Sequence, residues 1–365
     1  MFRNTLFKGA LFLMLGLGAV ATTQAQNLTL PQGSARAELK QTVGLTDITI
    51  NYGRPSVNGR EGEIWGKLVP YGLQQINFAS KGEVPWRAGA NENTTITFSK
   101  DVTVEGEALA AGSYGLHMIL KEDQSVTVIF SHNTTSWGSF WYDEGEDALR
   151  VEVTAEEGPY TELLTYDWLS IQNGEATLAL SWENLRIPIK MDVNLQATTL
   201  ASIREELRGL AGFTAVGLLQ AANWCLQQDV NHEEAIVWAN ASAAQQATFN
   251  AYAILGFLYT QNGQTEEGLE ALNQSAELAN AGQLNFLANR MLATYPEEAV
   301  KLLEQNAKAN PDNATYHNSL AQGYLAVGKE KAAIKSFRKV LSLDPPAPLR
   351  ASVEQGLKDL GQDVG

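Results

Sequence analysis

The hydrophobic pattern of this 365-residue chain changes its period once, close to Pro188. Before that point apolar and polar residues alternate, as in Ile48–Tyr52, which is the period of a strand with one buried face. After it apolar residues recur every three or four positions, as Leu200 and Ile203 do, which is the period of an amphipathic helix. We therefore predict a β domain followed by an α domain, with the boundary at residues 194–198.

The first part consists of short runs rich in β-branched and aromatic residues, separated by turn-forming residues. Tight turns at Val104–Glu107 and Lys121–Gln124 indicate hairpins. Residues 37–193 contain no stretch with the period of a long helix, so successive strands are expected to pair antiparallel. The fold class predicted here is an antiparallel β-sandwich or partly closed barrel. Its strands are expected at Ile48–Tyr52, Thr94–Phe98, Gly115–Leu120, Ser125–Phe130, Leu149–Val153 and Ala176–Trp182.

The second part repeats itself about every 34 residues. Small residues recur at Ala235, Gly268, Ala299 and Ala333, which are 33, 31 and 34 residues apart. A small residue at a helix crossing lets two helices pack closely, so four helix pairs stacked as an α-solenoid are expected. A final amphipathic helix, with apolar residues from Leu349 to Leu360, would cap the open end of the stack.

The repeating pattern of this part resembles the tetratricopeptide repeat. The resemblance is clearest over Tyr316–Pro345 and over the earlier copy Tyr252–Ser275. The resemblance implies a groove for an extended peptide or a partner helix, so we expect a protein or peptide partner. The alternative is an array that packs against the β domain or against a second copy. The expected groove positions lack basic side chains that would clamp a peptide carboxylate. They are Asn250, Ala253, Phe257, Thr260, Thr315, Asn318, Gln322 and Leu325.

The first 25 residues have the composition of a secretory signal peptide. Arg3 and Lys8 give a positive start, Ala10–Val20 is an apolar run, and Thr23–Ala25 offers small residues for cleavage. A membrane anchor is disfavoured because the run is shorter than the ~20 residues that span a bilayer. We expect export to the periplasm or the cell exterior, and no membrane span in a mature chain that begins near Gln26.

The charge of the chain excludes some classes of partner. The formal net charge is −15, and without Arg3 and Lys8 it becomes −17, with −11 over residues 26–195 and −6 over residues 196–365. Neither part offers the basic surface that nucleic acid requires, so no nucleic-acid partner is expected. The single cysteine, Cys225, lies in an apolar helical run and is not expected to be catalytic. No nucleophile elbow or phosphate-binding loop occurs, and we expect no cofactor.

Residues able to carry chemistry gather between Arg54 and Thr95. The order R-P-S-V-N-G-R, I-W-G-K-L-V-P-Y-G and W-R-A-G-A-N-E-N-T-T, followed by A-G-S-Y-G-L-H and W-G-S-F-W-Y-D, resembles the bacterial domain of unknown function 2911 over roughly residues 29–190. The resemblance implies a domain found mostly in Bacteroidetes, commonly behind a signal peptide, and it implies no activity. The connection Leu73–Pro85 is longer than usual, and we expect it at the rim of any pocket.

Seven residues of this stretch form the candidate ligand site. A guanidinium suits carboxylate or phosphate groups, and a tryptophan beside a loop can stack on a planar ligand. We expect these side chains to converge on a hollow that binds a small polar or anionic ligand. The alternatives are that the arginines pair with the protein's own groups and that the tryptophans close the end of the β domain. The candidates are Arg54, Arg60, Trp65, Trp86, Arg87, Asn91 and Glu92.

The segment Ser136–Asp143 adds four aromatic residues. If it is a strand, Trp137, Ser139 and Trp141 share one face, and an exposed face would extend an aromatic ligand surface.

Two other functions stay open. Glu92 and His117, with His132 as a second imidazole, would suit a metal-assisted hydrolase, although no metal-binding motif such as H-E-x-x-H occurs. A purely structural exported protein is the third possibility. The favoured interpretation is a non-enzymatic, exported binding and scaffolding protein, with a signal peptide at 1–25, a β domain at 26–194 and helical repeats at 195–365.

Overall fold

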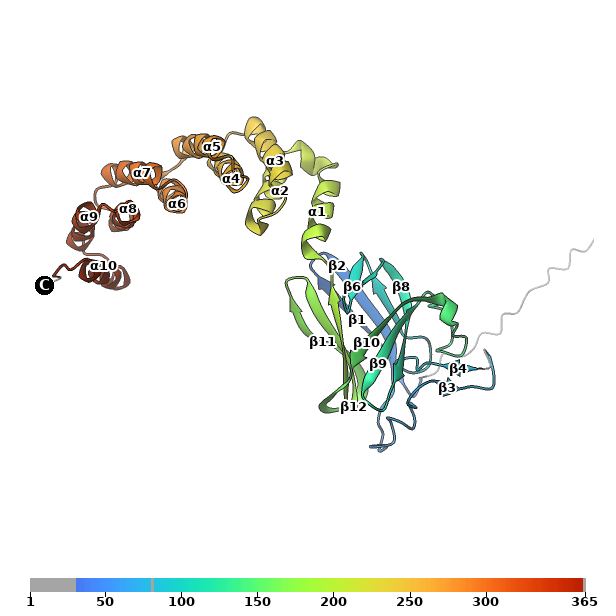
Figure 1. Ribbon diagram of the computed structural model, residues 1–365. Helices are drawn as coiled ribbons and strands as arrows, with labels where there is room; N and C mark the ends of the chain where they lie inside the picture. The colour runs from blue at the N-terminus through green and yellow to red at the C-terminus, as the bar shows by residue number, and fades with distance from the viewer. Residues whose placement is uncertain (1–30, 80–81, 364–365) are drawn as a thin grey trace, which may run out of the picture. The chain divides into compact units, whose positions relative to one another are not determined.

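The computed structural model describes residues 31–79 and 82–363, so the expected signal peptide lies outside the described residues. The chain divides into two compact units, a β unit that ends near Met191 and a helical unit from Asp192, to which the turns Thr42–Thr46 and Gln172–Glu175 also belong. Figure 1 shows the strands of the β unit and the helices of the helical unit.

The β unit contains a six-stranded, a four-stranded and a two-stranded sheet. The six-stranded sheet has the order β1-β2-β5-β8-β9-β10, the four-stranded sheet β11-β12-β6-β7, and the hairpin β3-β4 stands apart. The strands are β1 Ala35–Val43, β2 Thr46–Arg54, β3 Gln74–Gln75, β4 Glu83–Val84, β5 Thr95–Phe98, β6 Val102–Val104, β7 Glu107–Leu109, β8 Gly112–Leu120, β9 Ser125–Ser131, β10 Asp147–Thr154, β11 Glu156–Gln172 and β12 Glu175–Asp192.

The two larger sheets face each other across a shared core. In β8 the side chains of Tyr114, Leu116 and Met118 are buried on the inner face. Tyr52 of β2 packs edge-on against Tyr166 of β11, with ring centroids 4.8 Å apart, so side chains of both sheets meet between them. The predicted antiparallel β architecture is confirmed, in its sandwich form.

The sequence expectations for this unit differ from the structure in two places. Ser136–Asp143 forms turns, not a strand, because Gly138 adopts φ 61° within it. Trp137 and Trp141 are exposed while Ser139 is buried, so these three side chains do not share a face. The long edge strand β11 was not predicted.

The helical unit contains ten α-helices among the described residues. They are α1 Leu195–Glu206, α2 Ala215–Gln228, α3 His232–Gln245, α4 Phe249–Gln261, α5 Thr265–Leu278, α6 Ala281–Met291, α7 Pro296–Ala309, α8 Ala314–Ala326, α9 Glu330–Ser342 and α10 Ala347–Asp359. From α2 to α9 they form four consecutive pairs, as the repeat period predicts. Val353 and Leu357 of α10 are buried in a cluster with Phe337 of α9. None of the helices in the described residues is long and apolar enough to span a membrane.

The recurring small residues lie where the helices cross. Ala235, Ala299 and Ala333 have no exposed surface, and Gly268 is buried against α4. Leu210 lies at helical spacing after Ile203 but is 87% exposed, because α1 ends at Glu206 and a 3₁₀ turn redirects the chain.

Candidate functional site

The first two candidate arginines are held by backbone and hydroxyl groups of the protein. Arg54, at the end of β2, donates from Nε to the Leu164 carbonyl at 3.0 Å and from Nη2 to Thr165 Oγ1 at 2.6 Å. Arg60 donates to two carbonyl oxygens of residues 56–57, at 2.9 and 2.6 Å. Both guanidinium groups therefore brace loops against their surroundings, as the alternative interpretation of these residues expected.

Trp65 and Trp86 belong to a cluster with a third tryptophan, Trp182 of β12. Their ring centroids lie 5.8 Å apart, and each lies 5.7 or 6.4 Å from the ring of Trp182. Trp86 pairs with Met118 through two backbone hydrogen bonds of 2.9 and 2.8 Å, so its side chain shares the inner face of the sheet. The geometry favours closure of the sandwich core over stacking on a ligand.

Arg87 and Phe140 form a cation–π pair on the outer face of the same sheet. The guanidinium carbon lies 4.5 Å from the ring centroid, and Nη1 donates to the Asn91 carbonyl at 2.6 Å. Burial lowers the pKa of Arg87. We call Ser136–Asp143 the aromatic loop. A Cβ at Gly138 of this loop would lie 2.4 Å from the guanidinium carbon, so the glycine allows the loop to cover Arg87.

Asn91 and Glu92 bind the segment that leads into β1. Asn91 adopts φ 63° and donates from Nδ2 to Gln32 Oε1 at 2.9 Å. Glu92 accepts from Gln32 and lies 3.5 Å from Arg36 in an ion pair. The pKa of Glu92 is lowered, chiefly by a hydrogen bond from its own backbone N–H, with Gln32 and Arg36 adding to the effect.

The seven candidates thus have separate sets of partners and do not surround one hollow. Of the seven, Glu92 is the one that lines a surface pocket described below.

The two groups of the hydrolase hypothesis are also engaged separately. His117 is 2% exposed, its Nδ1 lies 2.8 Å from Ser139 Oγ, and its ring contacts Tyr142 edge-on. The serine and histidine resemble a nucleophile and base in spacing, but both side chains are buried and closed off from solvent. His132 instead packs near Tyr114. Within the described part of the chain, no group of three or more His, Cys, Asp or Glu side chains is placed to hold a metal ion.

Acidification is expected to destabilise the β domain through His117. Burial lowers the pKa of His117 to about 4, and the Arg87 charge acts in the same direction. In the unfolded chain the ordinary pKa is about 6.5, so between these values the unfolded state binds more protons and stability falls as the pH falls. At pH 4.5 the loss is on the order of 2 to 3 kcal/mol. Urea unfolding at several pH values between 7.5 and 4.5 measures how the free energy of unfolding changes with pH. The variant His117→Gln should lack the contribution of His117 to this pH dependence. An unchanged slope in that variant would contradict the assignment.

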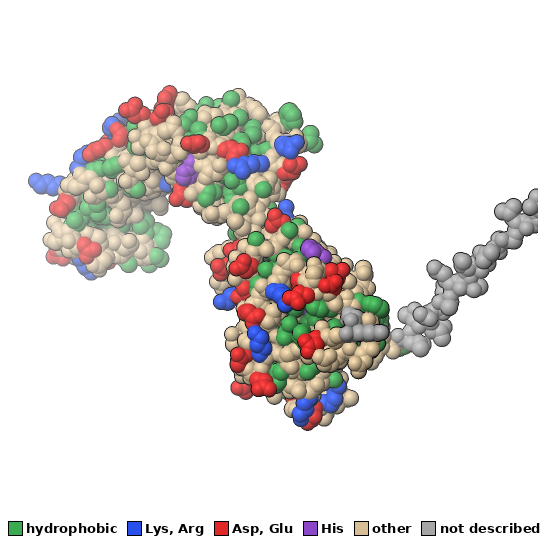
Figure 2. All heavy atoms as spheres, turned by 45° about the vertical axis from the view of Figure 1, so that its right-hand side comes forward, with side chains coloured by type: hydrophobic (Ala, Val, Ile, Leu, Met, Phe, Trp, Pro, Cys, Tyr) green, Lys and Arg blue, Asp and Glu red, His purple; other side chains and the backbone are tan. Residues whose placement is uncertain are grey.

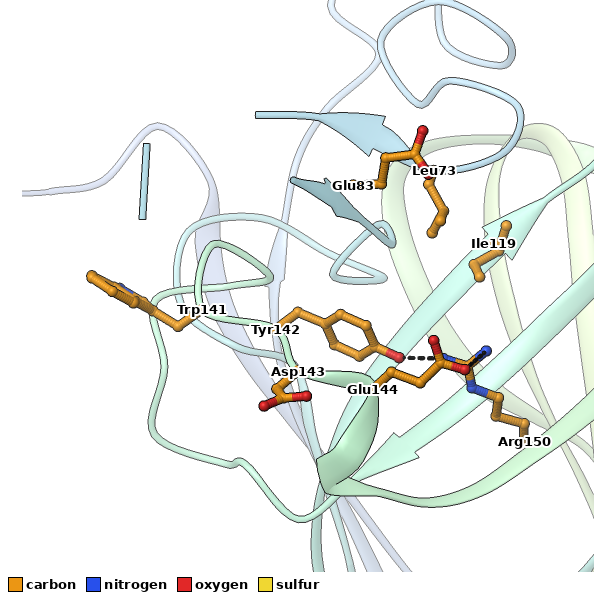
Figure 3. Close-up of a pocket in the computed structure, with 8 residues that line it drawn as sticks. All are labelled: Leu73, Glu83, Ile119, Trp141, Tyr142, Asp143, Glu144 and Arg150. Carbon is orange, nitrogen blue, oxygen red and sulfur yellow. Dashed lines mark hydrogen bonds and ion pairs between the residues drawn. The ribbon is translucent and has the colours of Figure 1, made fainter. Parts of the chain in front are cut away.

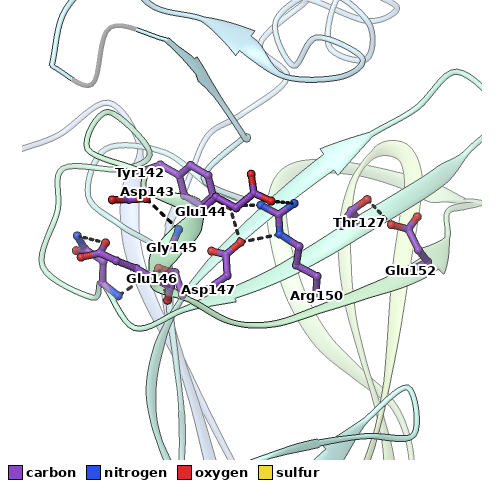
Figure 4. A network of polar contacts seen from close by, with 11 residues as sticks. Thr127, Tyr142, Asp143, Glu144, Gly145, Glu146, Asp147, Arg150 and Glu152 are labelled. Atoms are coloured by element: carbon purple, nitrogen blue, oxygen red, sulfur yellow. Dashed lines mark hydrogen bonds and ion pairs between the residues drawn. The ribbon is translucent and has the colours of Figure 1, made fainter.

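A polar network lies beside the aromatic loop (Figure 4). Arg150 of β10 donates to Asp147 and to Tyr142, each at 2.6 Å, and lies 3.2 Å from Glu144. Tyr142 in turn donates to Asp147 at 2.7 Å, and burial followed by the Asp147 contact raises the pKa of Tyr142. The network fixes the end of the loop onto β10 and leaves Arg150 fully engaged.

Two described residues of the insertion Leu73–Pro85 line a pocket of about 430 Å³ (Figure 3). Leu73 and Glu83 of the insertion lie on one side, and Tyr142 and Arg150 on the other. Because three acidic residues line the pocket and its one arginine is paired with protein groups, the pocket does not suit an anion. Its lining is Leu73, Glu83, Ile119, Trp141, Tyr142, Asp143, Glu144 and Arg150.

A second pocket, of about 490 Å³, lies over β5 and β8. We call it the hydroxyl pocket because Thr and Ser dominate its lining. It consists of Arg36, Glu92, Asn93, Thr95, Thr97, Ser113, Thr134, Thr135, Ser136 and Trp137.

The helical unit carries a groove of about 460 Å³ formed by α2, α4 and α6. Three predicted groove positions, Asn250, Ala253 and Phe257, line it, whereas Thr260 bonds to Tyr295. The groove also contains a basic residue that the sequence expectation omitted, Arg290 of α6. The full lining is Val216, Leu219, Gln220, Asn223, Gln227, Phe249, Asn250, Ala253, Ile254, Phe257, Phe286 and Arg290.

The chain was compared with known proteins by sequence and by structure. No curated protein matches it in sequence. Solved structures that it resembles include MamA, at 17% identity and a TM-score of 0.30 over 42% of this chain and 95% of MamA. YrrB, described as a TPR protein with an unusual peptide-binding site, is 16% identical with a TM-score of 0.32, over 45% of this chain and 85% of YrrB. The C-terminal part of a TPR repeat-containing protein from Cytophaga hutchinsonii is 15% identical with a TM-score of 0.32, over 41% of this chain and 60% of that one.

Family matches are more specific. Residues 34–191 match the family described as protein of unknown function (DUF2911), and residues 249–281 and 314–346 match the tetratricopeptide repeat. The first match covers the β unit, and the two repeat matches cover the helix pairs α4–α5 and α8–α9. The chain carries a DUF2911 domain followed by tetratricopeptide repeats.

Proposed function

We propose that this is an exported scaffolding protein whose helical repeats hold an extended, carboxylate-bearing peptide of a partner protein in the groove of α2, α4 and α6. Tetratricopeptide repeats indicate protein or peptide binding in general terms. The composition of residues 1–25 supports export. The observation that carries the proposal is Arg290, which has no ion-pair partner among the described residues and lies in an otherwise neutral groove.

The groove offers apolar contacts along its length. Phe257 is almost fully buried at its base, while Phe286 and Val216 remain more than half exposed at its sides. Exposed apolar side chains in a groove mark a surface that gains free energy when a partner covers it. The apolar side chains of a bound peptide would occupy this space.

Amide side chains provide the polar contacts that a peptide backbone needs. Asn223 and Asn250 line the groove. Asn285 and Asn318 are the fifth residues of α6 and α8, as Ala253 is of α4, and so continue the same row. Their buried Oδ1 atoms have no hydrogen-bond partner in the described part of the protein. The amide side chains that line the groove, Asn223 and Asn250, can donate hydrogen bonds to the backbone of an extended chain and accept hydrogen bonds from it.

Arg290 defines the charge of the expected ligand. Its guanidinium carbon lies 4.1 Å from the Phe257 ring centroid, and burial lowers the pKa of Arg290. No acidic residue lines the groove around it. Arg290 is exposed at the side of the groove and stacks on the Phe257 ring, so a carboxylate from the ligand could reach its guanidinium and pair with it. A terminal carboxylate or an acidic side chain next to an apolar residue fits this site.

Arg290→Gln is expected to weaken peptide binding at least tenfold, because a charge-assisted hydrogen bond is worth about 1.5–3 kcal/mol. The probe is a hexapeptide library prepared with free carboxylate and with carboxamide ends, and with acidic residues retained or replaced by their amides. Affinity for the full chain is measured by fluorescence anisotropy. The matched control is Arg208→Gln, since Arg208 is exposed and paired with Glu205. Equal binding of carboxylate and amide forms, or no binder in the library, would refute the proposal.

The hydrolase is not put forward as a second function. Glu92 pairs with Arg36 and His117 with Ser139, and the two belong to no metal-ligand cluster among the described residues.

A further inference from the structure

The hydroxyl pocket on the DUF2911 domain provides an inference independent of the peptide groove. Its floor is the outer face of the six-stranded sheet, where Thr95 and Thr97 of β5 lie beside Gly115 and Ser113 of β8. Because side chains alternate along a strand, these residues point away from the core that Ile96 and Tyr114 help to form. The sheet thus presents a row of hydroxyl groups on a rigid support.

One wall of the pocket is fixed by hydrogen bonds. Asn133 Oδ1 accepts from the Ser136 hydroxyl at 2.8 Å and from the Ser136 N–H at 3.2 Å, which orders the turn. Asn93 Nδ2 donates to the Asn133 carbonyl at 2.8 Å and ties this turn to the start of β5. A Cβ at Gly115 would lie 2.4 Å from the Asn133 carbonyl oxygen, so glycine permits this close approach. A site with fixed walls loses little entropy when a ligand binds.

Several polar groups of the pocket remain available. The hydroxyls of Thr95, Thr134 and Thr135 make no hydrogen bond to other groups in the described residues. Asn93 is 4% exposed, and its buried Oδ1 has no partner in the described part of the chain. Unsatisfied acceptors and free hydroxyls beside one another suit a ligand that both donates and accepts several hydrogen bonds.

Trp137 adds an apolar surface to this polar pocket. Its side chain is 51% exposed and lies at the edge of the pocket. An exposed indole offers a flat face on which the C–H face of a sugar ring can stack. Trp141 of the same loop is 60% exposed but lines the other pocket, on the side of Tyr142 away from Arg150 (Figure 3).

The charge of the pocket decides between a neutral and an anionic ligand. Its one cation, Arg36, is paired with its one carboxylate, Glu92, at 3.5 Å. The pocket is formally neutral, and the described face in Figure 2 intersperses acidic and basic side chains over the β domain. Glu92 remains one-third exposed and can accept further hydrogen bonds from hydroxyl groups.

We propose that the hydroxyl pocket of the DUF2911 domain binds a neutral saccharide, with the sugar ring stacked on Trp137 and its hydroxyl groups bonded to Glu92, Asn93 and the threonines. The volume of about 490 Å³ falls within the range of small-ligand sites. This site belongs to the β unit and the peptide groove to the helical unit, so the protein would carry one domain that binds a glycan and one that binds a peptide.

The test is a titration of the full chain with a defined panel: glucose, galactose, mannose, N-acetylglucosamine, their β-linked disaccharides, and the anion gluconate. Binding is detected by saturation-transfer NMR and quantified by calorimetry. At least one neutral sugar should bind, and more tightly than gluconate. Trp137→Ala should weaken it at least tenfold, and Thr134→Val should weaken it about threefold or more through loss of one hydroxyl.

Trp141→Ala is the matched control, since it removes an exposed indole of the same loop outside the hydroxyl pocket. Its affinity should stay within twofold of the unaltered protein. Circular dichroism spectra of all variants should coincide, because both tryptophans are largely exposed. The proposal is overturned if no neutral sugar binds, if gluconate binds more tightly, or if Trp141→Ala weakens binding as much as Trp137→Ala does.

Discussion

Replacing Trp182 with Ala is expected to lower the free energy of unfolding of the β domain by about 3–5 kcal/mol. Trp182 is 1% exposed and is the side chain against which both Trp65 and Trp86 pack. Its removal takes away a large apolar surface and leaves a cavity, because the two neighbours are held by the backbone and cannot collapse into the space. For a domain of ordinary stability this is a large share of the total.

Urea unfolding followed by circular dichroism measures this loss, since strands and helices contribute different spectra. The β-domain transition should move to lower urea while the helical transition stays in place. The control is Trp141→Ala, which removes an exposed indole and should change stability by less than about 0.5 kcal/mol. Similar shifts for the two variants would show that the tryptophan cluster does not stabilise the core.

The strands that carry a strict alternation could be predicted from the sequence. Ile48 and Ile50 face the core and pair with Phe98 and Ile96, so a local pattern and a long-range pairing agree. β11 could not be predicted in the same way. It is an edge strand with acidic residues and exposed apolar ones, such as Leu163 and Leu169, and its alternation is therefore weak.

Whether the seven candidate side chains meet at one site could not be predicted from the sequence, because it depends on the direction in which each side chain points. The sequence places Trp86 and Arg87 next to each other, but the pairing of Trp86 with Met118 turns one side chain into the core and the next one outward. Glu92 lines the hydroxyl pocket, and its pocket partners Thr134 and Trp137 come from a loop some forty residues later. No local pattern connects such residues.

The helical unit was easier to predict, because each repeat mainly contacts its neighbours along the chain. The small residues at helix crossings and the groove positions of α4 follow directly from the period. Arg290 was missed because the sequence prediction considered only equivalent positions on the first helix of each repeat. The long Arg290 side chain extends from α6 to the Phe257 ring on α4.

Gly268→Leu is expected to destabilise the helical unit by about 3 kcal/mol or more through overpacking. A Cβ at Gly268 would lie 2.6 Å from Thr260 Oγ1, 2.8 Å from Tyr295 Oη and 3.0 Å from the Gly256 carbonyl oxygen. The backbone of α4 cannot yield to a larger side chain without separating the two helices. Tyr295 also donates to the Thr265 carbonyl at 2.9 Å, so displacement of its ring would detach α5 from the start of α7.

The matched control is Gly282→Leu in α6, where a Cβ would meet no atom closer than 3.4 Å. There the substitution should be neutral or stabilising, because replacing a helical glycine removes about 1 kcal/mol of unfavourable propensity. Thermal unfolding at 222 nm distinguishes the two variants, and hydrogen exchange locates the opened helices at α4 and α5. Since α4 also forms one side of the peptide groove, Gly268→Leu should weaken hexapeptide binding as well. If both leucine variants unfold at the same temperature, close contact at Gly268 is not what holds this repeat together.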